Sequence, residues 1–200
     1  MLASILTLLA FVSYSQVQIK DTKLKQGLES VTGEPDISPQ GIVNNSFIAA
    51  NGERFLRFEI VVNTTINETW KMIATEAGIK KWMAPVANLD LRIGGMLQTN
   101  YNETAKIDDK GTIMLGIINY IPSEILTYKI TLNELFAENC RKEDKNLQHI
   151  IQLKSVGQNK TKIISTMAGW GQGKEWDEAY NFFEKGNKWT FQKLLNAFKE

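Results

Sequence analysis

The sequence is poor in the residues that most often build metal centres and covalent cross-links. Its 200 residues include one cysteine, Cys140, and one histidine, His149. A single cysteine cannot form an intramolecular disulfide or a cysteine cage for zinc, and no site can draw on a second histidine. We therefore predict neither a bound metal nor a cofactor, and we place Cys140 in a loop without a redox role.

The chain also lacks an excess of charge of either sign. It has 23 basic and 22 acidic residues, a net charge of +1, and no block of like charges. Nucleic acids and anionic membrane surfaces attract proteins through such blocks, so neither is a predicted partner. A hydrophobic fraction of 43% instead indicates one soluble globular domain with a sizeable core.

The N-terminal apolar run, Leu2 to Val12, is too short for an integral membrane span, which needs about 20 residues. The run is uncharged and is followed by the small residues Ser13 and Ser15, a pattern typical of a signal peptide cleaved before Gln16. The basic residue that usually precedes such a run is missing, and a buried N-terminal helix is the alternative. We predict a signal peptide over residues 1–15 and a secreted or periplasmic protein.

Residues 16–52 show little periodicity. Scattered charges up to Glu29 give way to Gly33, Pro35, Pro39 and Gly41, a composition typical of a solvated spacer. We predict a flexible N-terminal segment here, followed by a folded domain over residues 53–198.

The domain begins with a strand and two short helices. Residues 54–63 alternate apolar and polar side chains, as a half-buried strand does. Thr65 and Glu68 then have the spacing of a capping box at a helix N-terminus. Gly78 separates this helix from a second short one, which ends before Pro85.

Several strands follow in direct succession. Alternating segments run from residue 88 to residue 168, separated by turn residues such as Gly94-Gly95 and Pro122-Ser123. Strands joined by such short turns are antiparallel, so the sequence predicts an α+β fold with an antiparallel sheet of about six to seven strands.

The C-terminal stretch predicts one long helix. Three glycines in residues 169–173 allow a sharp change of direction, and an uninterrupted helical pattern follows them. Its acidic residues lie in the first turns and basic residues near the end, as the helix dipole favours. We expect the sheet to curve around this helix and to bury its apolar stripe. Phe183, Thr190 and Leu194 belong to that stripe, which is widened by Phe182, Trp189, Phe191, Leu195 and Phe198.

This order of elements resembles the START-like (SRPBCC) superfamily, in the branch of the activators of the ninety-kilodalton heat-shock chaperone's ATPase. The resemblance rests on Trp70, on Lys81-Trp82-Met83-Ala84-Pro85, on Asp90 to Gly95 and on Gly169-Trp170. It implies a helix-grip fold, in which a curved sheet holds the C-terminal helix above a pocket. Members bind lipids, sterols or other apolar molecules, some are cyclases or hydrolases, and some contact chaperones. The superfamily has no universal catalytic set, so the catalytic residues stay unknown.

We expect a small, largely apolar ligand in a cavity of about 300–1,000 Å³ between the sheet and the last helix. Gly94, Gly95 and Gly186 leave room between the layers, although close approach of the sheet would also explain the mid-helix Gly186. The predicted ligand-binding residues are Trp82, Tyr128, His149, Trp170 and Phe183.

Two other functions remain open at this point. A cyclase or hydrolase would need a buried ionisable group in the pocket, and His149 and Asp90 are the best candidates, although a structural role is the simpler interpretation of His149. A protein-interaction module, which would take a protein partner, would need an exposed apolar patch instead of an enclosed cavity.

Overall fold

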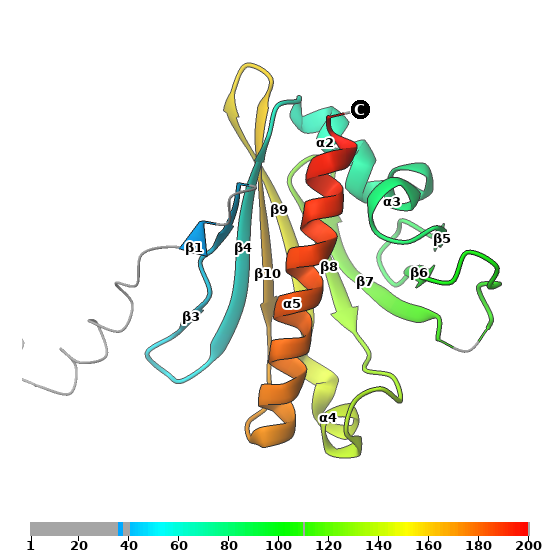
Figure 1. Ribbon diagram of the computed structural model, residues 1–200, viewed down its shortest axis with the longest axis vertical. Coiled ribbons are helices and arrows are strands. Elements are labelled where there is room, and N and C mark those ends of the chain that lie inside the picture. The colour runs from blue at the N-terminus through cyan, green and yellow to red at the C-terminus, as the bar shows by residue number, and fades with distance from the viewer. Residues whose placement is uncertain (1–35, 38–40, 110, 200) are drawn as a thin grey trace, which may run out of the picture. The chain divides into compact units, whose positions relative to one another are not determined.

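The computed structural model describes residues 36–37, 41–109 and 111–199. The predicted signal peptide and residues 16–35 of the predicted flexible segment lie outside the described residues. The described part contains four α-helices and one antiparallel sheet (Figure 1). Its elements are β1 (Asp36–Ile37), β2 (Ile42–Asn44), β3 (Phe47–Ile48), β4 (Arg54–Val62), α2 (Ile66–Ala74), α3 (Glu76–Trp82), β5 (Val86–Leu89), β6 (Met96–Asn100), β7 (Ile113–Ile121), β8 (Ile125–Ile130), α4 (Glu138–Glu143), a 3₁₀ turn (Asp144–Asn146), β9 (Gln148–Gly157), β10 (Lys160–Ala168) and α5 (Lys174–Ala197).

The sheet has the strand order β1-β2-β4-β10-β9-β8-β7-β6-β5, with β3 paired to β4 beside this path. The seven strands from β4 to β10 confirm the predicted antiparallel sheet of six to seven strands. Because β4 pairs with β10, the first strand of the predicted domain lies directly beside the last one. The two ends of the predicted strand series thus lie side by side before α5 begins, while the sheet itself stays open, with β1 and β5 at its ends.

The folded domain begins earlier than the predicted boundary at residue 53, because residues 42–48 already contribute strands to the sheet. Strands β2 and β3 both pair with β4, although the sequence analysis assigned them to a flexible segment. Ile42 is fully buried in the core, and the Phe47 ring stacks on Phe55 with centroids 4.8 Å apart. Strands of two or three residues are too short to show a period, which is why alternation did not reveal them.

The two predicted short helices are present. Thr65 caps α2 by accepting a hydrogen bond from the Glu68 amide at 3.2 Å, and Thr75 caps α3 through the Gly78 amide at 3.1 Å. The Glu68 carboxylate accepts a hydrogen bond from Lys71 at 2.7 Å, so only the hydroxyl half of the predicted capping box is seen. A further helix, α4, occupies the predicted loop around Cys140 and buries that side chain completely.

Two glycines at the start of α5 are required by their surroundings. Gly169 has φ +83°, and a Cβ there would lie 1.9 Å from the Asn146 carbonyl oxygen. A Cβ at Gly171 would lie 2.1 Å from Nε1 of Trp176, whose fully buried indole packs onto this backbone. The glycine-rich stretch is thus a turn packed tightly against α5.

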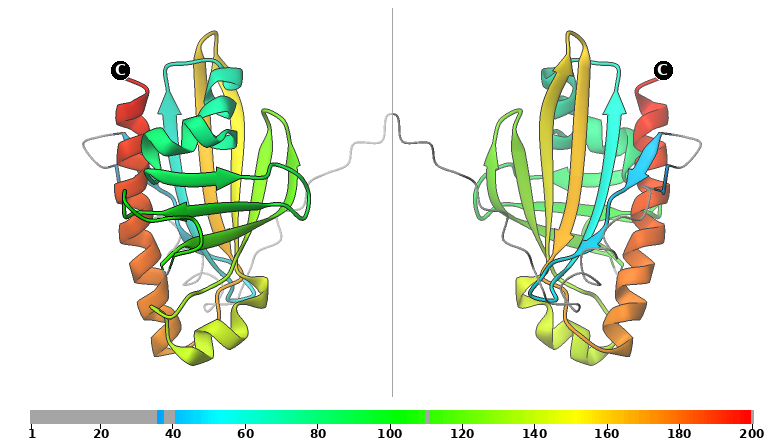
Figure 2. Two further views of the ribbon diagram at one scale, coloured as in Figure 1. Left: turned by 90° about the vertical axis from the view of Figure 1, so that its right-hand side faces the viewer. Right: turned by 90° about the vertical axis from the view of Figure 1, so that its left-hand side faces the viewer.

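Helix α5 lies along one face of the curved sheet (Figure 2). Its inner side packs against the core, where the Phe191 ring lies 5.8 Å from Phe58 of β4 and 6.5 Å from Trp82 of α3. The expectation that Phe182 and Trp189 join this buried stripe is wrong, because each is 55% exposed on the outer side of the helix. Aromatic residues surround α5 on several sides, so periodicity alone did not decide which side is buried.

Gly186 lies in the middle of α5, where glycine costs about 1 kcal/mol relative to alanine. A Cβ at this position would meet no atom of the described structure within 4 Å. Close approach of the sheet therefore does not explain this glycine. Within the described residues, no helix is long and apolar enough to cross a membrane.

Substituting the buried tryptophan of α3, which packs against the inner side of α5, and the exposed tryptophan of α5 should distinguish the two sides of that helix. Trp82→Ala should lower the free energy of unfolding by about 3–5 kcal/mol, because it empties a fully buried site in the core. Trp189→Ala should lower it by less than about 1 kcal/mol, because that side chain is half exposed. Urea denaturation followed by circular dichroism measures both, and equal losses would contradict the packing described here.

Candidate functional site

A small cavity lies between α5 and the sheet. Its volume is about 110 Å³, well below the predicted 300–1,000 Å³, because large side chains from both layers fill most of the space. Apolar side chains form most of its wall. The residues that line it are Trp82, Met83, Thr99, Tyr101, Ile113, Leu115, Ile130, His149, Met167, Phe183, Asn187, Thr190 and Phe191.

The structure brings three of the five predicted site residues together at this cavity. Trp82 of α3, His149 of β9 and Phe183 of α5 all line it. Tyr128 is buried beside His149, with ring centroids 6.5 Å apart, and stands behind the cavity wall. Trp170 instead lines a groove on the other face of the sheet.

His149 is buried, and its uncharged side chain forms part of the cavity wall. Its Nε2 atom lies 2.7 Å from the Ser165 hydroxyl of β10, within hydrogen-bonding distance. Burial lowers the pKa of the imidazole to about 4, so the ring is neutral at physiological pH. Burial likewise raises the pKa of the Tyr128 hydroxyl, which keeps this part of the core free of charge.

These surroundings limit the chemistry of the cavity. Ser165 is 1% exposed, so its hydroxyl is out of reach of a substrate. Asp90 forms an ion pair with Arg92 at 2.8 Å in the exposed turn after β5 and does not line the cavity. Among the described residues, no group of three or more histidine, cysteine or carboxylate side chains could hold a metal ion. The arrangement favours binding, with one neutral imidazole available for a hydrogen bond.

Two exposed aromatic residues flank the cavity on the outside. Tyr101, just after β6, lines the cavity and packs against Trp189 of α5 with ring centroids 6.2 Å apart. The Tyr101 hydroxyl interacts with the Thr190 side chain, and burial of its ring raises its pKa. Sequence reasoning missed Tyr101, because it lies in a turn without any periodic signal.

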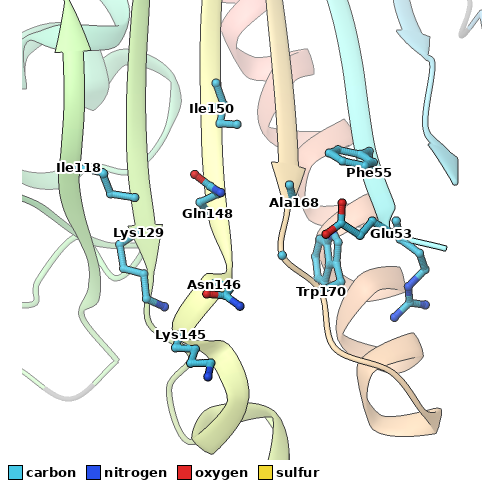
Figure 3. Close-up of a pocket in the computed structure, with 12 residues that line it drawn as sticks. Glu53, Phe55, Ile118, Lys129, Lys145, Asn146, Gln148, Ile150, Ala168 and Trp170 are labelled. Carbon is cyan, nitrogen blue, oxygen red and sulfur yellow. The ribbon is translucent and has the colours of Figure 1, made fainter. Parts of the chain in front are cut away.

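A larger groove of about 570 Å³ lies on the sheet face turned away from α5 (Figure 3). Trp170 and Phe55 stand on one side of it, and Lys129 and Lys145 on the other. Lys129 is held by the Asp144 side chain at 3.3 Å and by the Ile130 carbonyl oxygen at 2.5 Å. Two further charged side chains line the groove. Arg54 forms an ion pair with Asp177, and Glu53 is acidic, opposite in sign to the two lysines.

Trp170 has a structural role at the base of α5. Its ring packs against Tyr180 and Phe183, with centroids 5.0 and 5.7 Å apart, and its Nε1 donates to the Met167 carbonyl at 3.2 Å. Charged and polar side chains, among them Glu53, Lys145 and Gln148, make up much of the groove wall, while the cavity beneath α5 has a mostly apolar lining. We take the cavity as the candidate site.

Comparisons with known proteins agree with this architecture. The sequence model of the family described as activator of Hsp90 ATPase homolog 1-like protein matches residues 63–199. No curated protein sequence matches the chain significantly.

Several solved structures share the fold. The Aha1 dimer from Colwellia psychrerythraea is 16% identical, with a TM-score of 0.52 over 70% of this chain and 90% of that one. A protein from Mesorhizobium loti is 16% identical, with a TM-score of 0.57 over 73% and 97%. A protein from Nitrosomonas europaea is 15% identical, with a TM-score of 0.54 over 72% and 94%. At these identities the likeness shows the fold alone.

The low pKa of His149 predicts a specific dependence of stability on pH. Between its unfolded pKa near 6.5 and about 4, the unfolded chain binds a proton that the native protein does not. The free energy of unfolding should therefore fall as the pH drops through this window, by up to about 3 kcal/mol from this group, and level off below it.

Two measurements check this dependence. His149→Gln should remove that part of the pH dependence, seen as a smaller loss of stability between pH 7 and pH 4.5 than in the parent chain. Because His149 is the only histidine, its ring protons can be followed by NMR without ambiguity. Titration of the native ring near pH 6.5 would show that it is open to water.

Proposed function

Because this chain belongs to the family of activator of Hsp90 ATPase homolog 1-like proteins, we propose that it is a binding module for a small, largely apolar molecule, without catalysis of its own. The proposed site is the cavity between α5 and the sheet. The observation that carries the proposal is the composition of the cavity wall. Side chains from both layers meet there, and most of them are apolar.

The volume of about 110 Å³ restricts what can enter. In other proteins, a dry cavity of about 150 Å³ lined by leucine, isoleucine and phenylalanine binds benzene or xenon. The cavity therefore suits one small ring or the end of a short chain. A larger ligand would have to displace Tyr101, Trp189 or Phe183, the aromatic residues that line or flank the space.

A few polar groups could orient such a ligand. The neutral imidazole of His149 and the side chains of Asn187 and Thr190 line the cavity. Asn187 contacts the Met167 sulfur at 3.1 Å, and Thr190 donates to the Gly186 carbonyl at 2.8 Å. A few polar groups in a mainly apolar wall are typical of small-molecule sites, where they fix the orientation of the ligand. Trp82 and Phe183 would supply apolar contact, and Tyr128 would support the imidazole from behind.

A second candidate function is binding of a protein partner. The observation that favours it is the group of exposed apolar side chains on and beside α5, of which Leu135 is 76% exposed and Phe182 and Trp189 are each 55% exposed. Exposed apolar side chains gathered in this way often mark interaction surfaces.

A titration with benzene, followed by NMR of the folded chain, tests the cavity. Leu115→Phe should abolish saturable one-to-one binding, because the larger side chain fills the space that Leu115 lines. Ile118→Phe is the matched control on the same strand, since Ile118 lines the groove on the opposite face, and it should bind like the parent. Binding that survives Leu115→Phe, or is lost in Ile118→Phe, would refute the proposed site.

We also propose that the protein is exported. Support comes from the uncharged run Leu2 to Val12 and the small residues Ser13 and Ser15 after it. Mass spectrometry of the protein from its native source should find a chain that starts at or near Gln16. Recovery of a chain with an intact Met1 from the cytosolic fraction would count decisively against export.

A further inference from the structure

The outer side of α5 carries two large aromatic side chains in solvent. Phe182 and Trp189 are each 55% exposed, and residues seven apart lie on the same face of a helix. Phe182 packs against the edges of Phe136 and Phe183, at 5.2 and 5.7 Å between centroids, and Trp189 packs against Tyr101. In Figure 1, α5 lies in front of the sheet, and no other described helix or strand lies in front of α5.

Charges along the same side of α5 change sign from one end to the other. Glu178 lies one turn and Glu175 two turns before Phe182, and Lys193 lies one turn after Trp189. The Lys193 ammonium stands over the Trp189 ring at 4.7 Å. From N- to C-terminus, this side therefore has an acidic end, two aromatic residues with Lys185 between them, and a basic end. Such an order is complementary to itself when it is reversed.

We propose that two copies of this chain associate through an antiparallel pairing of their α5 helices. The two-fold axis passes between Lys185 and Gly186. With the axis there, Phe182 of one copy meets Trp189 of the other, and Glu178 of one copy meets Lys193 of the other. Each contact occurs twice, as a two-fold interface requires.

A hollow beside Phe182 fits the incoming Trp189 side chain. It has a volume of about 230 Å³ and is lined by Leu135, Phe136, Ala137, Glu175, Glu178, Ala179 and Phe182. Leu135 is 76% exposed at its rim. Aromatic anchors that fill such pockets carry much of the binding energy of protein interfaces. When Trp189 of one copy enters this hollow on the other, the Lys193 ammonium that lies over its ring would come within reach of the other copy's Glu175 and Glu178 carboxylates.

The pairing also accounts for Gly186. Within the described part of the chain, a Cβ at this position meets nothing within 4 Å, so the fold of one copy gives no reason for a glycine. At the crossing point of two helices, a residue without a side chain lets the two backbones approach closely. Lys185 of the second copy would lie over this position.

Charge reversal at two positions tests the antiparallel register. Sedimentation equilibrium of the parent chain should show a monomer–dimer equilibrium. Glu178→Lys and Lys193→Glu should each weaken the dimer by about tenfold or more, because like charges then face each other. The double variant should restore the affinity to near that of the parent, since each swapped charge again meets its opposite across the axis.

Two further variants complete the test. Gly186→Leu should weaken the dimer by separating the helices, while circular dichroism shows an intact fold. Lys154→Glu, on the sheet face away from α5, should leave the dimer unchanged and controls for net charge. A parent chain that stays monomeric at concentrations of about 100 μM, or a double variant no better than the single ones, would overturn the proposal; the latter result would mean that this face takes a different partner or register.

Discussion

The packing of α5 onto the curved sheet is the constraint on which the rest of the structure depends. The helix can reach the sheet only because the chain turns sharply after β10, where Gly169 and Gly171 leave no room for side chains. Trp176 then fills the space over Gly171 and donates its indole N–H to Glu143 at 3.0 Å. This contact joins α5 to α4, and the helix runs from there along the whole sheet (Figure 2).

The character of the cavity follows from that packing. Large side chains close most of the gap between the layers, which leaves about 110 Å³, and the same closeness removes water from His149. The ring therefore stays neutral, with a pKa of about 4, and keeps Ser165 as its partner. A cavity of this kind can bind apolar matter and offer one hydrogen bond, and an imidazole with so low a pKa is a weak general base at neutral pH.

Local patterns were enough to predict most of the fold. Alternation located the long strands, and the threonine at position 65 located the start of α2, because both signals depend on a few neighbouring residues. The size of the cavity could not be predicted, since it is set by how closely two distant layers pack. Three of the predicted residues, Trp82, His149 and Phe183, project from regular elements and line the cavity. Sequence reasoning missed Tyr101, because nothing in a turn indicates which way a side chain points, and it placed Trp189 on the wrong side of a helix that is aromatic on several sides.

The central claim is that the space beneath α5 is an apolar binding site, and xenon tests it most directly. Xenon enters dry apolar cavities without needing a specific hydrogen bond, so its position reports the cavity independently of ligand identity. A crystal of the protein pressurised with xenon should show an anomalous peak beneath α5, among Leu115, Met167 and Phe183. Absence of xenon from this space, with peaks only in the groove beside Trp170 or none at all, would contradict the account.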